Sequence, residues 1–174
     1  MNTFIIAVYV ENKAGVLTRV TGMFTRRGFN IDTLTVGETE RSEYSRITIS
    51  MRGDEKSKQQ LINQLKKLYV VKRIEVLEDE PIKRELMLIK IKNKPETRSD
   101  VMTAVDVFRA SVIDYSPEGM CIEVTGNPSK IDAFVKLMQP FEIIEMCRTG
   151  VIALQRGSEC LREMDMTYLR QYKK

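Results

Sequence analysis

The sequence contains no histidine and no tryptophan among its 174 residues. Histidine is the commonest general acid or base near neutral pH and the commonest metal ligand, so its absence argues against hydrolytic triads and most zinc sites. The sequence also lacks glycine-rich phosphate loops, nucleophile elbows, and cysteine or carboxylate clusters with metal-ligand spacing. We therefore expect the chain to have no catalytic activity of its own and no metal site.

Cysteine is scarce, and no long apolar run is present. Cys121, Cys147 and Cys160 are odd in number and far apart, which favours free thiols in a reducing compartment over a disulfide or zinc framework. The apolar run near the N-terminus covers only residues 4–10, whereas a membrane helix needs roughly 20 apolar residues. The first three residues carry no side-chain cation to start a signal peptide. These features predict a cytoplasmic protein.

The sequence has nearly balanced charge, with 28 basic and 24 acidic residues and a net charge of only +4. So small a value gives little reason to expect nucleic acid or a membrane surface as partner. With 43% hydrophobic residues, a chain of 174 residues can bury one core or two small ones. We expect a soluble globular protein of one or two domains.

The most informative pattern lies in residues 11–32. The apolar residues 4–10 before it predict a buried strand, and a turn containing Gly15 follows that strand. The next apolar residues recur at helical spacing: Val16, Val20, Met23 and Phe24. Gly28 stands where a helix end favours a residue with positive φ. The unit therefore reads as strand, turn, helix and glycine stop, with a second strand over residues 31–39.

The turn before this helix is a candidate anion site. Backbone N–H groups at a helix N-terminus have no partner within the helix, and their partial positive charge suits a small anion such as an amino-acid carboxylate. Asn12 and Asn30 are placed to add polar side chains. Taken alone, Gly15 also fits a purely conformational role, and the two asparagines fit turn and cap roles.

Element order predicts the fold class. Further strands are expected over residues 44–51 and 70–77, and the helix between them has Leu61, Ile62, Leu65 and Leu68 at helical spacing. The resulting order is βαββαβ, which predicts a ferredoxin-like α+β sandwich. Residues 78–81 are acidic and contain a proline, so we expect a domain boundary there.

The second half repeats the same order. Strands are expected over residues 83–92, 111–115, 120–125 and 142–147, with helices over residues 99–109 and after Asn127. The prediction is thus two ferredoxin-like βαββαβ sandwiches, with domains over residues 1–79 and 80–157 and a C-terminal tail over residues 158–174.

RNA-recognition domains share this topology, but they place aromatic residues on the central strands to stack bases. The strand expected over residues 45–51 has no aromatic residue, and Tyr9 is the one aromatic residue in the outer part of the first strand. An RNA-binding protein is therefore the less favoured alternative.

Seven short motifs, spread along the chain, allow a comparison with known protein families. They are, in order, Glu11-Asn12-Lys13-Ala14-Gly15-Val16-Leu17, Arg27-Gly28-Phe29-Asn30-Ile31, Leu34-Thr35-Val36, Ser45-Arg46-Ile47-Thr48, Arg84-Glu85-Leu86-Met87-Leu88-Ile89-Lys90, Phe108-Arg109 followed by Asp114, and Arg148-Thr149-Gly150-Val151. The first of these resembles the start of an ACT domain, the amino-acid-sensing module of biosynthetic enzymes. Together the motifs resemble the small regulatory subunits of acetolactate synthase, also called acetohydroxyacid synthase, over about residues 3–157.

The resemblance implies a regulator in valine, leucine and isoleucine biosynthesis. Such a subunit binds and activates a catalytic large subunit, which carries thiamine diphosphate, Mg²⁺ and FAD, and it confers feedback inhibition by a branched-chain amino acid, usually valine. The regulator itself holds no cofactor. A free-standing amino-acid-responsive ACT regulator is the alternative.

The resemblance also implies a homodimer that pairs its ACT domains, with the effector between the turn of one chain and strand residues of the other. Carried over by position, the turn side consists of Asn12, Ala14, Gly15, Val16 and Leu17. The strand side consists of Asn30, Ile31, Leu34, Thr35 and Val36.

Overall fold

The computed structural model describes residues 2–78, residues 80–158 and residue 161. These described residues form two compact units, one of the residues up to Ile82 together with those from Ala153, and one of Lys83–Ile152. Each unit contains an antiparallel sheet with two helices in βαββαβ order, which confirms the α+β fold class. In the described part of the chain, the helices are too short or too polar to span a membrane.

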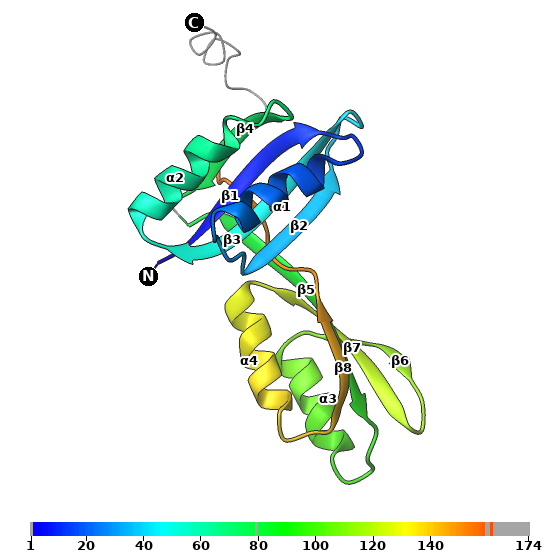
Figure 1. Cartoon of the computed structure of the whole chain (residues 1–174). Helices are drawn as coiled ribbons and strands as arrows, with labels where there is room; N and C mark the ends of the chain where they lie inside the picture. Colours follow the sequence, from blue (N-terminus) through cyan, green and yellow to red (C-terminus); the bar gives the residue numbers. More distant parts are fainter. Residues whose placement is uncertain (1, 79, 159–160, 162–174) are drawn as a thin grey trace, which may run out of the picture. The chain divides into compact units, whose positions relative to one another are not determined.

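The first unit consists of six main elements. They are β1 (Asn2–Glu11), α1 (Val16–Arg26), β2 (Thr33–Glu38), β3 (Tyr44–Gly53), α2 (Glu55–Leu65) and β4 (Val71–Leu77). The strands lie in the order β2-β3-β1-β4, and both helices cover one face of this sheet (Figure 1). β1 is therefore central, and β2 is an edge strand.

Strand alternation builds the core of the first unit. Ile6 pairs with Ile49 and Val8 pairs with Ile47 across β1 and β3, and all four side chains are buried in the cluster under the helices. α1 contributes its four predicted residues to the same cluster: Val16, Val20, Met23 and Phe24. The helical and strand periodicities in the sequence thus meet at one apolar layer.

Two predicted boundaries in the first unit were wrong. α2 ends at Leu65 because tight turns follow it, with the Leu68 amide donating to the Leu65 carbonyl at 3.0 Å, so Leu68 packs on the core from outside the helix. β2 begins at Thr33, so Ile31 precedes the strand. The Asp32 amide donates to Ser50 at 2.9 Å and leads the chain into the ladder.

The second unit has the same order of elements. They are β5 (Ile82–Lys92), α3 (Arg98–Val107), β6 (Ser111–Tyr115), β7 (Gly119–Gly126), α4 (Pro128–Met138) and β8 (Ile143–Arg148). A short β9 (Ile152–Leu154) begins at the last residue of this unit. The main strand order is β6-β7-β5-β8. Helices and sheet enclose a second apolar cluster, in which Phe134 is fully buried and meets Phe108 edge to face at 5.2 Å between ring centroids. Cys121 and Cys147 are free thiols, and Cys160 lies outside the described residues.

A bidentate ion pair ties β8 to β5. Arg148 donates from Nε to Glu85 Oε1 at 2.9 Å and from Nη2 to Glu85 Oε2 at 2.7 Å, and its Nη1 reaches Asp132 at 2.9 Å. The Glu85 side chain is only 2% exposed. Its hydrogen bond raises the pKa of Arg148 above the ordinary value. The charge of Glu85 is thus compensated inside the second unit.

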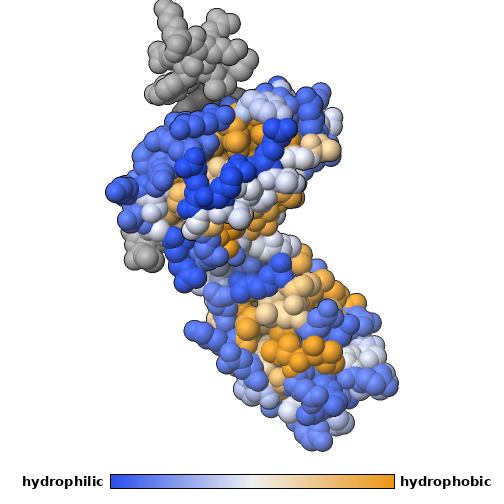
Figure 2. Space-filling view, viewed as in Figure 1, coloured by the Kyte–Doolittle hydropathy of each residue, from blue (hydrophilic) through white to orange (hydrophobic). Residues whose placement is uncertain are grey.

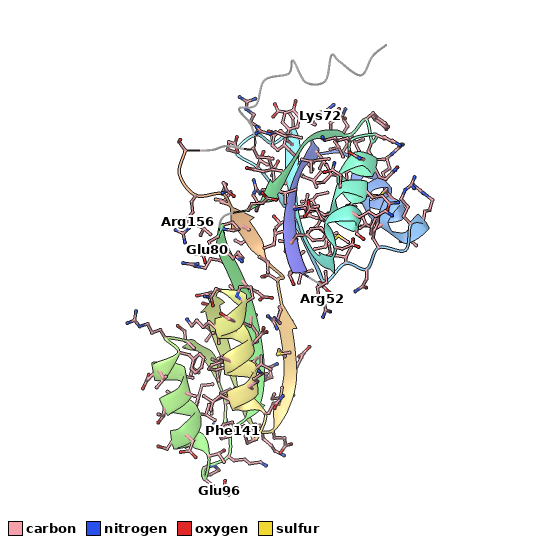
Figure 3. All side chains as sticks on the ribbon, turned by 90° about the vertical axis from the view of Figure 1, so that its left-hand side faces the viewer. Arg52, Lys72, Glu80, Glu96, Phe141 and Arg156 are labelled. Carbon is pink, nitrogen blue, oxygen red and sulfur yellow. The ribbon has the colours of Figure 1, made fainter. Side chains whose placement is uncertain are left out.

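The chain returns to the first unit after the second is complete. Arg46 Nη2 on β3 donates to the Ala153 carbonyl at 2.7 Å, and Gln155 Nε2 donates to the Glu78 carbonyl at 3.0 Å. Arg156 Nε donates to the Glu80 carbonyl at 2.9 Å, and Figure 3 shows these two residues side by side. We call residues 153–158 the returning segment.

Candidate functional site

The candidate site begins at the turn between β1 and α1. Gly15 is the N-cap of α1 and has φ +81° in the left-handed region, which residues with a Cβ rarely adopt. A Cβ built on Gly15 meets no atom within 4 Å. The space beside the helix N-terminus is therefore open, and glycine is required there by conformation rather than by crowding.

The backbone N–H groups of this turn divide into used and unused ones. The Asn12 amide donates to Glu43 at 2.8 Å, the Lys13 amide to Glu11 at 3.1 Å, and the Val16 amide to Lys13 at 3.3 Å. Within the part of the chain that the structure describes, the N–H groups of Ala14, Gly15, Leu17 and Thr18 meet no acceptor. These four donors lie at the positive end of the helix dipole and can receive an anion.

The Asn12 side chain fixes the turn against the β2–β3 hairpin. Its Nδ2 donates to the Ser42 carbonyl at 2.8 Å and reaches Glu38 Oε1 at 3.4 Å. No donor among the described residues reaches its Oδ1, which remains an acceptor beside the turn. The hairpin partners Glu38, Ser42 and Glu43 escaped the sequence analysis, because a charged connection between strands carries no periodic signal.

Charge around the turn is compensated locally. Glu11 forms ion pairs with Lys72 and with Lys13. The hydrogen bond from Lys72, followed by that from Lys13, lowers the pKa of Glu11 below its ordinary value. The hydrogen bond to Glu11 in turn raises the pKa of Lys13. The carboxylate of Glu11 therefore stays ionised near neutral pH, but two ammonium groups neutralise its repulsion of an anion at the turn.

The strand-side residues lie on β2 and just before it. Leu34 and Ile31 pack partly against the core, while Val36 on β2 and Leu17 on α1 remain 41% and 43% exposed. β2 pairs with β3 along one side only, since it ends the strand order. Its other backbone edge, together with these apolar side chains, offers a surface on which another chain can pair.

The structure brings only some of the predicted site residues together within one chain. Asn12 contacts Glu38, so the turn lies at the C-terminal end of β2. Asn30 and Ile31 lie beyond the opposite end of α1, whose 11 residues span roughly 16 Å. A single chain therefore cannot place Asn30 against the donors at Gly15.

Comparisons with known proteins agree with this architecture. A family model described as "AHAS small subunit-like ACT domain" matches residues 6–73. A second, described as "Small subunit of acetolactate synthase", matches residues 84–157. Between them the two matches cover most of both units.

Individual relatives give the same result. The chain is 46% identical over 154 residues to a probable acetolactate synthase small subunit of Archaeoglobus fulgidus, covering 88% of this chain and 97% of that one. It is 43% identical over 156 residues to the acetolactate synthase small subunit of Mycolicibacterium smegmatis, covering 89% and 92%.

A solved structure shows the same fold. The crystal structure of the acetolactate synthase small subunit from Thermotoga maritima superposes with a TM-score of 0.86 at 36% sequence identity, covering 91% of this chain and all of that one. With two family models, relatives matched over nearly their full length and this structural match in agreement, the chain belongs to the acetolactate synthase small subunit family.

Proposed function

We propose that this chain is a regulatory subunit that binds the catalytic large subunit of acetolactate synthase, raises its activity and confers feedback inhibition by valine. The observation that carries the proposal is the ACT-type turn at Gly15, with four unused N–H donors beside open space, in a chain of this family. We further propose that it acts in the cytoplasm and binds no cofactor. Thiamine diphosphate, Mg²⁺ and FAD would reside on the large subunit.

The turn suits the polar half of a free amino acid. The effector carboxylate would accept hydrogen bonds from the N–H groups of Ala14, Gly15 and Leu17, close to the helix dipole. The effector ammonium would donate to Asn12 Oδ1, whose position is fixed by the hydrogen bond from its own amide nitrogen to Ser42. Both ends of the zwitterion would thus have partners on one turn.

The apolar half of the effector requires a second chain. Because Asn30 and Ile31 lie beyond the far end of α1 from Gly15, we propose that they act on the site of a paired copy. The open edge of β2, with half-buried Leu34 and Thr35 and exposed Val36, supports a homodimer through the ACT domains. In this arrangement the valine side chain would rest on Leu17 and Val16 of one chain and on the strand side of the other.

The domain organisation is part of the proposal. We assign effector sensing to residues 1–79 and the remainder of the regulatory function to residues 80–157, with the tail from residue 158. The separate family matches to residues 6–73 and 84–157 support this division.

The test is reconstitution with the cognate large subunit. The chain alone should form no acetolactate from pyruvate, its addition should raise turnover of the large subunit severalfold, and valine should inhibit only the mixture. Acetolactate formed by the purified chain alone, or a large subunit indifferent to it, would contradict the proposal. Leucine and isoleucine serve as comparison effectors, since their side chains differ from valine by about one methylene or branch position, a difference worth about 0.8 kcal/mol per buried methylene.

A further inference from the structure

The near-neutral overall charge conceals a strongly basic region. Residues 12–31 contain four basic residues and no acidic one, and residues 56–74 contain six basic residues and no acidic one. These ten cations exceed the net charge of +4 for the whole chain. The remaining residues are therefore net negative, and positive charge is concentrated on the segments that form α1, α2 and their connections to the sheet.

Much of this charge is exposed and has no acidic neighbour. Lys13, Lys58 and Lys72 form ion pairs. Six other cations are exposed, and the described residues place no carboxylate within ion-pair distance of them: Arg19, Arg26, Arg27, Lys56, Lys66 and Lys67. We call these six the basic helical face. In the space-filling view, much of the surface of the first unit is hydrophilic, with apolar areas between (Figure 2).

The basic helical face includes a cavity and an ordered contact between an arginine and a tyrosine. A cavity of about 360 Å³ between α1 and the connection from α2 to β4 is lined by Arg19, Arg26, Lys67 and Tyr69, among others, and by no acidic residue. The Arg19 guanidinium lies over the Tyr69 ring, 5.0 Å from its centroid, although Tyr69 is 67% exposed. Arg and Tyr are the residue types that most often anchor protein interfaces.

The charge pattern decides between possible occupants. A second copy of this chain related by a two-fold axis would bring the basic helical face against itself, so like charges would oppose the contact. A nucleic acid strand would find few aromatic rings for stacking on the described helical layer, and Arg19 already covers one face of Tyr69. An acidic protein surface meets neither objection.

We infer that the basic helical face of the first unit is the surface through which this chain binds its large catalytic subunit, and that the large subunit contacts it with acidic side chains. The inference rests on the proposed function. It leaves the β2 edge free for pairing with a second copy, because Arg19 lies on α1 and Lys67 lies in the connection that leads into β4, the edge strand opposite β2.

Charge reversal in the full-length chain tests the inference. Arg19→Glu with Lys67→Glu should weaken binding of the purified large subunit more than about tenfold and reduce the salt dependence of the remaining affinity. The neutral pair Arg19→Gln with Lys67→Gln should fall between this variant and the wild type. Both positions are exposed, and unchanged thermal unfolding would show that the variants fold.

A matched control changes the same amount of charge elsewhere. Arg84→Glu with Lys136→Glu reverses two exposed cations of the second unit and should leave large-subunit affinity within about twofold of wild type. A photo-crosslinking residue at position 69 should attach to an Asp- and Glu-rich peptide of the large subunit.

Four results would overturn the inference. Equal losses of large-subunit affinity in the variant of the basic helical face and in the control variant would show a general effect of charge. Wild-type affinity in Arg19→Glu with Lys67→Glu would place the contact elsewhere while leaving the proposed function intact. Nucleic acid that copurifies with the wild type and is lost in this variant would assign the face to a different partner. If the wild type fails to bind the large subunit at all, the proposed function falls with the inference.

Discussion

Arg46 on β3 and Ala153 near the end of the described chain are joined by a 2.7 Å hydrogen bond across 107 residues of sequence. Arg46 is half-buried and Ala153 is buried. The guanidinium thus serves as an internal contact of the first unit, to which the chain returns only after it has built the whole of the second.

We predict that Arg46→Ala lowers the free energy of unfolding of the first unit by about 2 kcal/mol, because it removes a charge-assisted hydrogen bond to a buried carbonyl. Urea unfolding followed by circular dichroism measures the change. The control is Arg52→Ala, since the Arg52 side chain, paired with Asp32, is 67% exposed and should contribute less than about 1 kcal/mol. Equal losses of unfolding free energy in the two variants would show that the hydrogen bond to Ala153 stabilises the unit no more than an exposed ion pair does.

A fragment of residues 1–82 should fold, because it retains all four strands, both helices and the core of the first unit. It lacks the hydrogen bonds that Arg46, Glu78 and Glu80 make with the returning segment. We therefore expect a lower Tm than for the same fragment with residues 152–161 joined by a flexible linker. A fragment without amide-exchange protection would show that the unit cannot fold from its N-terminal part.

The Glu85–Arg148 pair should be costly to break from one side. Arg148→Met leaves a carboxylate that is 2% exposed without its cation, and we predict a loss of about 3 kcal/mol in the stability of the second unit. The double variant Glu85→Leu with Arg148→Met should recover most of that loss, because no buried charge remains. Additive losses in the double variant would contradict this account.

Gly15→Asp tests the effector site. A carboxylate at this position would repel the effector carboxylate by about 4 kcal/mol at 4 Å with an effective dielectric near 20, and a side chain at φ +81° adds about 1–2 kcal/mol of strain. A small amino acid bound with micromolar to millimolar affinity, about 4–8 kcal/mol, loses most of its binding to this penalty. We predict loss of valine binding by calorimetry and feedback-resistant acetolactate formation, with activation of the large subunit retained.

The control for that experiment is Gly15→Ala, which adds strain without charge. No atom lies within 4 Å of the added Cβ, so we expect an intermediate loss of valine affinity. Undiminished valine inhibition in Gly15→Asp would refute the site, whereas a variant that neither binds valine nor activates would indicate misfolding.

Local pattern was enough to predict the βαββαβ elements of both units, but not the short β9. Alternation at Ile47, Ile49 and Met51 identified β3, and helical spacing from Val16 to Phe24 identified α1 with its buried face. The ends of the helices and strands were harder to predict from the sequence. Leu68 continues the helical spacing of α2, yet the backbone leaves the helix after Leu65 because local turns satisfy its final carbonyl groups.

Contacts between distant polar groups were not predictable from the sequence. Glu85 and Arg148 are 63 residues apart, and Asn12 meets Ser42 across 30 residues. Such pairs form because the backbone fold brings single side chains together, and a lone polar residue in a strand or turn leaves no periodic trace. The resemblance to regulatory subunits located the residues of the turn. The structure added which of their N–H groups remain available.

The separation of Asn30 from Gly15 along α1 has a consequence for how the protein would respond in a cell. If the effector site is completed by a second chain, then valine affinity is linked to self-association, and each process strengthens the other. Dilution below the dissociation constant of the pair would remove the sites themselves, so inhibition would fade even at saturating valine. The inhibitory response would then report the abundance of the regulator as well as the supply of its effector.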